Sequence, residues 1–262
     1  MKRAHRELQL PGVRLRYRDD GAGPVVVFVH GWTLDLDVWE PQMPLAAELR
    51  VVRYDRRGFG LSSGRPSLSA DVDDLRALLY SLGIVSPLLV GMSQGARVVL
   101  GFAARHPGVA RGLVLDGPPP LDDSDVPMEK FRQTVARDGL EVFRRQWSEH
   151  PLTQLVTGDS GTHSLLAQIL ARYPGHDLIE GQVIEDELET ARLAQVHGPS
   201  LIINGARDTE TRRGAGLALR AALPAADHVF IQQAAHLPNL DAPQAYNQIM
   251  SEFAHRPVPA AA

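Results

Sequence analysis

An apolar run that ends in a serine flanked by glycines constrains this chain more than any other stretch. It reads Pro87-Leu-Leu-Val-Gly-Met-Ser-Gln-Gly-Ala96 and continues into a helix-compatible segment. We interpret it as a strand, a sharp turn with Ser93 at its tip, and a helix, because a Cβ atom at Gly91 or Gly95 would collide with the neighbouring strand or helix. Ser93 would then lie above a sheet, at a helix N-terminus that favours negative charge. A nucleophile of acyl transfer is expected at such a position.

The composition fits one soluble globular domain, alone or with an insertion. The chain has 262 residues, of which 44% are hydrophobic and 22% are charged. A net charge of −4 predicts no nucleic-acid partner and no anionic-membrane partner. The absence of cysteine excludes disulfides, thiolate metal sites and a cysteine nucleophile. No apolar run has the length of a signal h-region near the N-terminus or of a membrane span further on, so we expect a cytoplasmic protein.

Strand and helix patterns alternate through the first 117 residues. Residues 7–10 and 13–17 alternate polar and apolar around Pro11-Gly12, which predicts a hairpin at an antiparallel edge. Apolar runs that predict buried strands lie at 25–29, at 51–54, before Ser93 and at 112–116. Helical patterns lie at 38–48, at 69–82 and from the serine turn to about 106. This order predicts a parallel sheet with helices on both faces.

The alternation stops after residue 117 and resumes near residue 199. Segments 128–147, 164–173 and 185–195 have helical periodicity, and no buried strand pattern separates them. We expect a helical cap or lid over residues 118–198, inserted into a core domain of residues 1–117 and 199–262. The core resumes with strand patterns at 200–204 and 227–231, and with helical patterns at 213–223 and 243–253.

Five ordered motifs resemble those of the α/β-hydrolase superfamily along nearly the whole chain. They are His30-Gly31-Trp32, Asp55-x-Arg-Gly-x-Gly-x-Ser62, Gly91-x-Ser-x-Gly95, Asn204-Gly205-x-x-Asp208, and His236 followed by Asp241-Ala-Pro243. The cap and the motifs are most similar to the enol-lactonase and small carboxylesterase branch of capped serine hydrolases. The resemblance implies an α/β fold with a mostly parallel eight-stranded sheet, helices on both faces and a helical cap.

The resemblance implies a catalytic triad of Ser93, His236 and Asp208. The serine hydroxyl is a poor nucleophile and needs a base, and His236 could take its proton and return it to the leaving group. Asp208 would orient the imidazole and stabilise its protonated form. Asp116 is the rival acid, because some relatives place theirs after the strand that follows the nucleophile. The family usually has glycine where this chain has Ala235, which leaves the geometry of the histidine loop open.

Backbone N–H groups would form the oxyanion hole. The resemblance assigns this role to Trp32 and Gln94. The Trp32 side chain would line the pocket or pack in the core. For His30 and for the Asp55-Arg-Arg-Gly58 stretch we expect structural roles beside this loop.

Substrate-binding residues are expected beneath the cap. The candidates besides Trp32 are Arg97, one helical turn after the nucleophile, and an apolar stripe of the insertion. A buried Arg97 would suit a carboxylate substrate, although a salt bridge to a neighbouring helix fits it as well. The stripe comprises Phe131, Val135, Phe143 and Trp147, and ordinary packing between cap and core is its alternative role. Further arginines would be candidates for substrate binding if the substrate were an organic acid. They are Arg132, Arg144 and Arg145.

The predicted function is hydrolysis of a carboxylic ester or lactone through an acyl-enzyme. The predicted partner is a small-molecule ester, lactone or related carbonyl compound, with no cofactor and no metal. Alternatives with the same triad are a carbon–carbon bond hydrolase, the menaquinone-pathway lyase and a cofactor-free perhydrolase. Dehalogenases and epoxide hydrolases are disfavoured, because they need a carboxylate where Ser93 stands. The alternative of a different class is a ligand receptor that retains the triad. The sequence predicts no oligomeric state.

Overall fold

The computed structural model describes residues 5–121, 126–179, 193–223 and 225–256. Within these residues the strands are β1 (Arg6–Leu10), β2 (Val13–Asp20), β3 (Val25–Val29), β4 (Arg50–Tyr54), β5 (Leu88–Met92), β6 (Gly112–Asp116), β7 (Ser200–Gly205) and β8 (Ala226–Ile231). The α-helices are α1 (Leu68–Ser81), α2 (Gln94–Arg105), α3 (Met128–Asp138), α4 (Leu140–Ser148), α5 (Ser160–Ala171), α6 (His176–Ile179), α8 (Glu210–Ala222), α9 (Pro238–Asp241) and α10 (Pro243–Ala254). Two 3-10 helices are η1 (Leu36–Ala47) and η2 (Pro151–Thr153).

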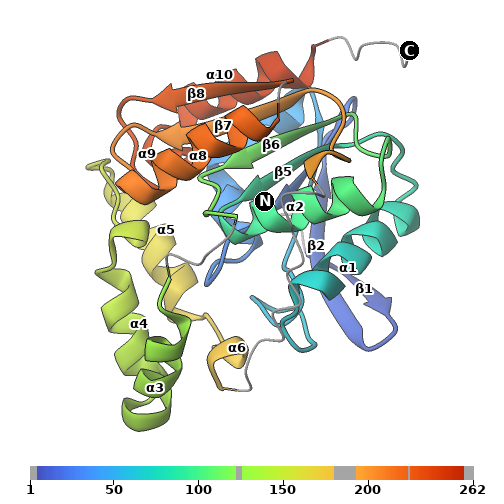
Figure 1. Cartoon of the computed structure of the whole chain (residues 1–262). Coiled ribbons are helices and arrows are strands. Elements are labelled where there is room, and N and C mark those ends of the chain that lie inside the picture. The colour runs from blue at the N-terminus through green and yellow to red at the C-terminus, as the bar shows by residue number, and fades with distance from the viewer. Residues whose placement is uncertain (1–4, 122–125, 180–192, 224, 257–262) are drawn as a thin grey trace.

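The eight strands form one sheet in the order β1-β2-β4-β3-β5-β6-β7-β8 (Figure 1). The pairs β1 with β2 and β2 with β4 are antiparallel, and the other five pairs are parallel. This confirms the predicted edge hairpin and the mostly parallel sheet of eight strands. Strand β5, which leads to Ser93, lies between β3 and β6 near the middle of the sheet. The carboxyl ends of parallel strands meet at one edge, which is where ligands bind in such sheets.

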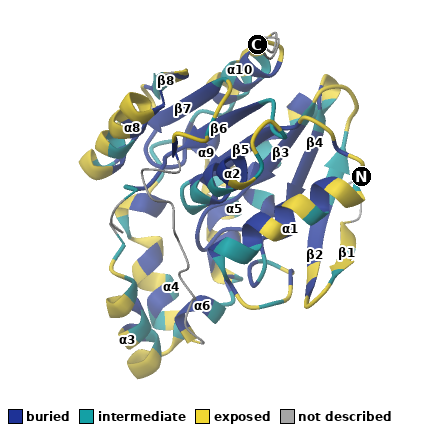
Figure 2. Cartoon of the chain, turned by 45° about the vertical axis from the view of Figure 1, so that its right-hand side comes forward, coloured by how far each residue is buried: buried dark blue, intermediate teal, exposed yellow. Residues whose placement is uncertain are grey.

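Both faces of the sheet are covered, as the dark strands between paler helices show (Figure 2). Successive side chains of a strand point to opposite faces. On β3, Val26 and Phe28 join the apolar cluster that includes residues of η1 and α10. Val27 and Val29 join the second cluster, with residues of α1, α2 and α8. The side chains on both faces of β3 are apolar, so the sequence of the strand is a continuous hydrophobic run.

Most predicted elements of the core lie within a few residues of the observed ones. The strand predicted at 112–116 is β6 itself, and the helix predicted at 69–82 is α1, Leu68–Ser81. The segment predicted at 38–48 forms the 3-10 helix η1, with Pro41 and Pro44 inside it. The short helices α6 and α9 and the 3-10 helix η2 were not predicted.

Helices follow one another between β6 and β7, at one end of the sheet (Figure 1). The segment predicted at 128–147 is divided into α3 and α4 at Gly139, which has φ of +87°. The segment predicted at 164–173 corresponds to α5, and most of the one predicted at 185–195 lies outside the described residues. The division of the chain into core and cap remains a prediction.

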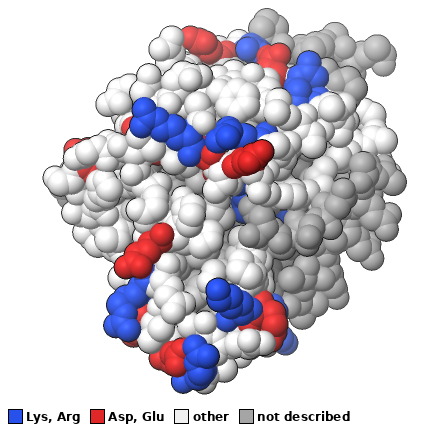
Figure 3. All heavy atoms as spheres, turned by 60° about the vertical axis from the view of Figure 1, so that its left-hand side comes forward, with Lys and Arg blue, Asp and Glu red and all other residues white. Residues whose placement is uncertain are grey.

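One face of the surface carries acidic and basic side chains close together rather than in separate fields (Figure 3). A dispersed pattern of this kind fits the small net charge of −4. In the described part of the chain, no helix has both the length and the apolarity that crossing a membrane requires.

Candidate active site

Ser93 lies at the sharp turn between β5 and α2. Its φ of +50° and ψ of −117° are strained for a residue with a Cβ atom. A Cβ at Gly91 would lie 2.3 Å from the Gly95 carbonyl oxygen, and one at Gly95 would lie 2.3 Å from the Val29 carbonyl oxygen. The predicted need for both glycines therefore has a direct steric cause. The Ser93 N–H group donates to the Asp116 carbonyl oxygen at 2.7 Å, which fixes the turn to β6.

His236 and Asp208 form a buried hydrogen-bonded pair. The Nδ1–H group of His236 donates to Asp208 Oδ2 over 3.0 Å, and each residue is 3% exposed. The other oxygen of this carboxylate, Oδ1, accepts the Thr209 N–H group at 2.7 Å. Two donors thus hold Asp208, and the carboxylate holds the imidazole with Nδ1 protonated. This leaves Nε2 as the basic nitrogen.

The loop that carries His236 is anchored by Asp241. The Ala235 N–H group donates to Asp241 Oδ2 at 2.8 Å, and the other oxygen accepts the Val156 and Thr157 N–H groups at 2.6 and 3.0 Å. The Asp241 carboxylate therefore links the histidine loop to the segment before α5. The loop also packs closely on Gly205, where a Cβ would lie 2.0 Å from the Ala235 carbonyl oxygen.

Asp116, the rival acid, lies at the end of β6 and is fully buried. Burial raises the pKa of its carboxyl group well above the ordinary value, and the negative charge of Asp208 acts in the same direction. A neutral acid cannot stabilise an imidazolium as a carboxylate does. The carboxylate that contacts His236 is that of Asp208, and its assignment as the catalytic acid remains a prediction.

A cavity lies beside Ser93 and His236. The space within and in front of it is about 850 Å³, part of it open to solvent. Other predicted site residues that line it are Trp32, Gln94, Arg97 and Trp147. Apolar side chains make up much of the remaining wall, among them Leu34, Leu68, Val126, Met128 and Leu152. In the ranges that the structure describes, no group of three His, Asp or Glu residues is suited to hold a metal ion.

The loop that contains Trp32 lies directly against Ser93. A Cβ on Gly31 would be 3.3 Å from both the Met92 carbonyl oxygen and Ser93 Cβ. Gln94 is the first residue of α2, so its N–H group belongs to the helix N-terminus beside Ser93. The backbone positions of Trp32 and Gln94 are compatible with the predicted oxyanion hole, whose assignment remains a prediction.

His30 stabilises the Trp32 loop as a neutral imidazole. Its Nδ1–H group donates to the Gly31 carbonyl oxygen at 2.8 Å, and Nε2 accepts the Arg56 N–H group at 2.9 Å. Burial lowers the pKa of His30 to about 3, and the Arg56 charge adds to that effect. The contacts agree with the structural role expected for His30.

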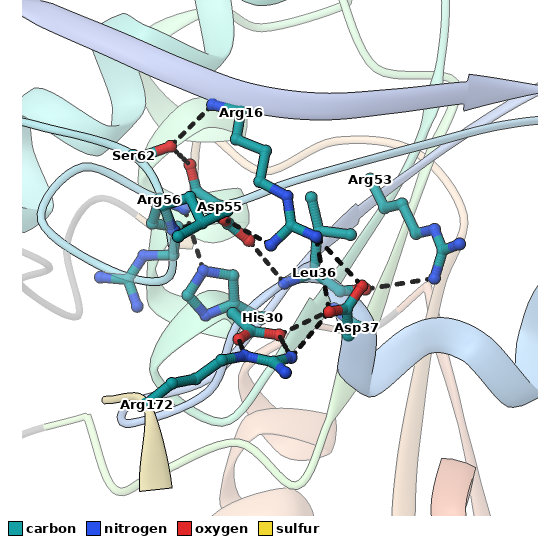
Figure 4. A network of polar contacts seen from close by, with 11 residues as sticks. Arg16, His30, Leu36, Asp37, Arg53, Asp55, Arg56, Ser62 and Arg172 are labelled. Carbon is teal, nitrogen blue, oxygen red and sulfur yellow. Dashed lines mark hydrogen bonds and ion pairs between the residues drawn. The ribbon is translucent and has the colours of Figure 1, made fainter. Parts of the chain in front are cut away.

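The Asp55 to Gly58 stretch belongs to a polar network behind the site (Figure 4). Asp55 accepts the Leu36 and Leu61 N–H groups, both at 2.8 Å, and pairs with Arg16 at 3.3 Å. Arg172, which follows α5, pairs with Asp37 at 2.7 Å and joins the end of α5 to the network. These contacts fit the structural role expected for the stretch.

Both arginines of this stretch pair with acidic residues of α1. Arg56 pairs with Asp71 at 2.6 Å and also donates to Gln94 Oε1 at 2.8 Å. Arg57 pairs with Asp74 at 2.7 Å. The stretch therefore fixes α1 and the side chain of Gln94, the residue after Ser93.

Two predicted substrate residues lie outside the cavity wall. Phe131 and Phe143 do not line it; their rings pack 6.0 and 5.8 Å from the Trp32 ring and 5.2 Å from each other. Trp147 does line it, and its Nε1–H group donates to Thr33 Oγ1 at 2.8 Å. The apolar stripe of α3 and α4 therefore serves mainly as packing over the Trp32 loop. For Phe131 and Phe143 the structure gives no support to a substrate-binding role.

The same aromatic cluster contains a buried carboxyl group that the sequence did not single out. Asp177 accepts hydrogen bonds from Trp32 Nε1 and from the Tyr173 hydroxyl group. Burial raises the pKa of Asp177. The contact joins α6 to the loop that carries Trp32.

Among the predicted arginines, Arg97 lines the cavity and donates to the Pro120 carbonyl oxygen at 2.6 Å. The other three do not line it; they are Arg132, Arg144 and Arg145. The arginine that sequence reasoning missed is Arg212, which lines the cavity and contacts Ser93 Oγ at 3.0 Å. The predicted helix began at 213, whereas α8 begins at Glu210, so the position of Arg212 in the first turn was not anticipated.

The fold and this arrangement of residues define a known family. The family model described as alpha/beta hydrolase fold matches residues 24–243, and the chain belongs to this family. This confirms the resemblance drawn from the motifs.

The proteins that are similar to this chain include some that are named as esterases or as a lactonase. A bifunctional esterase/perhydrolase of Acinetobacter calcoaceticus is 37% identical over 42% of this chain and 43% of its own length. A thermophilic esterase from Thermogutta terrifontis is similar in structure, with a TM-score of 0.83, 25% identity and coverage of 97% of this chain and 100% of that one. The enol-lactonase from Burkholderia xenovorans LB400 has the same fold, with a TM-score of 0.83, 22% identity and coverage of 96% and 100%. The matched segments span 36% and 43% of the length of two of the curated relatives.

Proposed function

We propose that this protein is a serine hydrolase that cleaves a carboxylic ester or lactone through an acyl-enzyme. The observation that carries the proposal is the pairing of His236 with Asp208 at 3.0 Å in the wall of the cavity that Ser93 also lines. A strained serine, a histidine with a protonated Nδ1 and a buried carboxylate are the three components that nucleophilic acyl transfer needs.

The first half of the reaction forms the acyl-enzyme. Ser93 Oγ attacks the substrate carbonyl carbon while its proton passes to His236 Nε2. The Trp32 and Gln94 N–H groups stabilise the negative charge that develops on the carbonyl oxygen. The bond to the leaving alcohol then breaks, and His236 returns the proton to the alcohol oxygen.

The second half releases the acid. A water molecule attacks the acyl carbon and gives a proton to His236. The bond between the acyl carbon and Ser93 Oγ then breaks, and the proton goes to Ser93 Oγ. Asp208 stabilises the imidazolium in both halves.

A perhydrolase reaction is the second candidate. It is favoured by the 37% identity to a protein named as both esterase and perhydrolase. In this reaction hydrogen peroxide, in place of water, attacks the same acyl-enzyme and releases a peracid. The proposed site therefore serves both reactions, and the two differ only in the second nucleophile.

Fluorophosphonate labelling followed by a substrate panel tests the proposal. Wild type should be labelled and Ser93→Ala should not be. The panel contains esters, lactones and vinylogous diketones, with and without hydrogen peroxide. Failure of wild type to label would exclude an activated serine. Labelling without turnover of any panel member would favour a ligand receptor or a specialised lyase, whereas peracid formation faster than ester hydrolysis would favour a perhydrolase.

A further inference from the structure

The Arg212 guanidinium group contacts the oxygen of the proposed nucleophile. Its Nη1 group donates to Ser93 Oγ at 3.0 Å and to the Gly117 carbonyl oxygen at 3.1 Å. The residue is 2% exposed and lies in the first turn of α8, four positions after Asp208. The helix that follows the proposed acid therefore also supplies a cationic donor to the nucleophile.

Several contacts fix Arg212 in this position. The Thr209 hydroxyl group accepts the Arg212 N–H group at 3.3 Å, and the Asn204 side chain donates to the Arg212 carbonyl oxygen at 3.3 Å. Gly117, which accepts from the guanidinium, is itself held to β7 by its N–H group, at 2.8 Å from the Ile203 carbonyl oxygen. A guanidinium group is a cationic hydrogen-bond donor with no acceptor atom. The donor beside Ser93 Oγ is thus preorganised and cationic.

A donor at Ser93 Oγ has different consequences in the two halves of the proposed reaction. When Ser93 attacks, Oγ loses its proton to His236 while it gives electron density to the new bond to carbon; these two changes offset each other, so the hydrogen bond that Arg212 already makes to the resting hydroxyl group changes little. When the acyl-enzyme breaks down, the electron pair of the bond between carbon and oxygen returns to Oγ, so the same hydrogen bond strengthens. Only an interaction that is stronger in the transition state than in the ground state increases a rate.

We propose that Arg212 is a catalytic residue that stabilises the departing Ser93 oxygen and thereby accelerates deacylation. This inference rests on the proposed function, because it requires an acyl-enzyme on Ser93. Arg212 supplies charge stabilisation, while His236 supplies the proton that Oγ finally receives. No proton leaves the guanidinium in any step.

The kinetic consequence is specific to deacylation. With an acyl-enzyme intermediate, kcat/KM depends on binding and acylation, whereas slow deacylation lowers kcat and KM by the same factor. A hydrogen bond from a charged donor contributes enough to change a rate about 10- to 100-fold. Loss of the Arg212 side chain should therefore lower kcat and KM together by about tenfold or more, and change kcat/KM by less than about threefold.

Stopped-flow hydrolysis of p-nitrophenyl acetate tests the inference with four proteins. They are the wild type, Arg212→Met, Arg212→Lys and the control Arg220→Met, which changes an exposed arginine of the same helix α8. Arg212→Met should release a burst of close to one p-nitrophenol per active site and then turn over slowly. Arg212→Lys keeps a cation at this position. Its kcat should lie between those of wild type and Arg212→Met, and its KM should fall less than that of Arg212→Met. Arg220→Met should behave as wild type.

Different outcomes would overturn different parts of the account. A fall in kcat/KM as large as the fall in kcat, with no burst, would assign Arg212 to acylation or to folding and would overturn the inference. A rise of KM limited to esters that carry a carboxylate would make Arg212 a substrate anchor instead. If Arg212→Met does not fold, the kinetics of Arg212→Lys test the inference instead. Values of kcat and KM in Arg212→Lys that equal those of wild type would contradict the inference. A decrease confined to kcat/KM would contradict it as well. Absence of fluorophosphonate labelling and of p-nitrophenol release in wild type would refute the proposed function itself.

Discussion

His236 Nδ1 lies 3.0 Å from Asp208 Oδ2, although the carboxyl group of Asp116 is buried at the end of β6 nearby. The two acids differ in their surroundings. Asp208 accepts hydrogen bonds from an imidazole and from a backbone N–H group, whereas burial raises the pKa of Asp116 well above its ordinary value. Burial of Asp116 thus disfavours its carboxylate form, which is the form that stabilises a protonated imidazole.

Replacement of each acid by its amide should separate the two roles. Asp208→Asn should lower kcat about 10³- to 10⁴-fold, because the amide cannot stabilise the imidazolium and favours the wrong tautomer. Asp116→Asn should change kcat by less than about threefold, since an amide resembles a neutral acid in shape and charge. Steady-state ester hydrolysis by the two variants, with fluorophosphonate labelling as a check of the site, provides the comparison. A larger loss of turnover in Asp116→Asn would make Asp116 the catalytic acid.

Gly117 is expected to set the position of the His236 ring. A Cβ at this residue would lie 2.9 Å from His236 Cε1 and 3.1 Å from Nδ1, so Gly117→Ala must displace the imidazole. A displacement of about 1 Å in a catalytic group can lower a rate about 100-fold, so we expect kcat to fall about 10- to 100-fold. The measurements are ester hydrolysis and the midpoint of thermal unfolding.

Gly108→Ala is the matched control for this change. Gly108 also has a positive φ, +77°, but a Cβ there would meet no atom within 4 Å. Both variants should lose about 1 kcal/mol or more of stability from the backbone strain. Equal activities of the two variants would show that the contact with His236 has no catalytic consequence.

His30 should make the protein less stable as the pH falls. Its pKa is about 3 in the folded protein and 6.5 when exposed, so between these values the unfolded chain binds a proton that the folded chain does not. The contribution of His30 to stability is therefore complete above pH 6.5 and decreases as the pH falls toward 3, by about 1.4 kcal/mol per pH unit within that window. Asp55 and Asp71 act in the opposite direction, because burial raises their pKa values to about 7 and about 6 from 3.8.

Urea unfolding between pH 4 and pH 6 isolates the His30 contribution. The free energy of unfolding of wild type should fall more steeply with decreasing pH than that of His30→Gln, by about 1.4 kcal/mol per pH unit. The contributions of Asp55 and Asp71 are common to both proteins and cancel in this difference. Parallel pH profiles for the two proteins would mean that His30 is protonated in the folded state.

The parts of the site that local sequence determines could be predicted. The turn at Ser93 follows from two glycines beside one serine, and the positions of Asp208 and His236 follow from motifs at the ends of two strands. A parallel sheet brings the ends of such strands to one edge whatever connects them. The hydrogen bond between Asp208 and His236 agrees with this expectation.

The parts that depend on packing between distant segments could not be predicted. Arg212 reaches Ser93 across 119 positions of the chain, and its role depends on where the first turn of α8 begins. Phe131 and Phe143 have the spacing of one helix face, but the spacing does not say whether that face meets a ligand or the Trp32 ring. Helical periodicity also gave no sign of the break between α3 and α4 at Gly139, where φ is +87°.

The intact mass of the protein during turnover tests the central proposal most directly. An ester such as p-nitrophenyl acetate is mixed with the Arg212→Met variant and with Ser93→Ala, the reactions are quenched in acid within the burst phase, and the adduct is located by peptide mass spectrometry. The account predicts one acetyl group per active site of Arg212→Met, attached to Ser93, and none on Ser93→Ala. Ester hydrolysis by Ser93→Ala at the wild-type rate, with no acetyl adduct on Ser93 in wild type or variant, would contradict it.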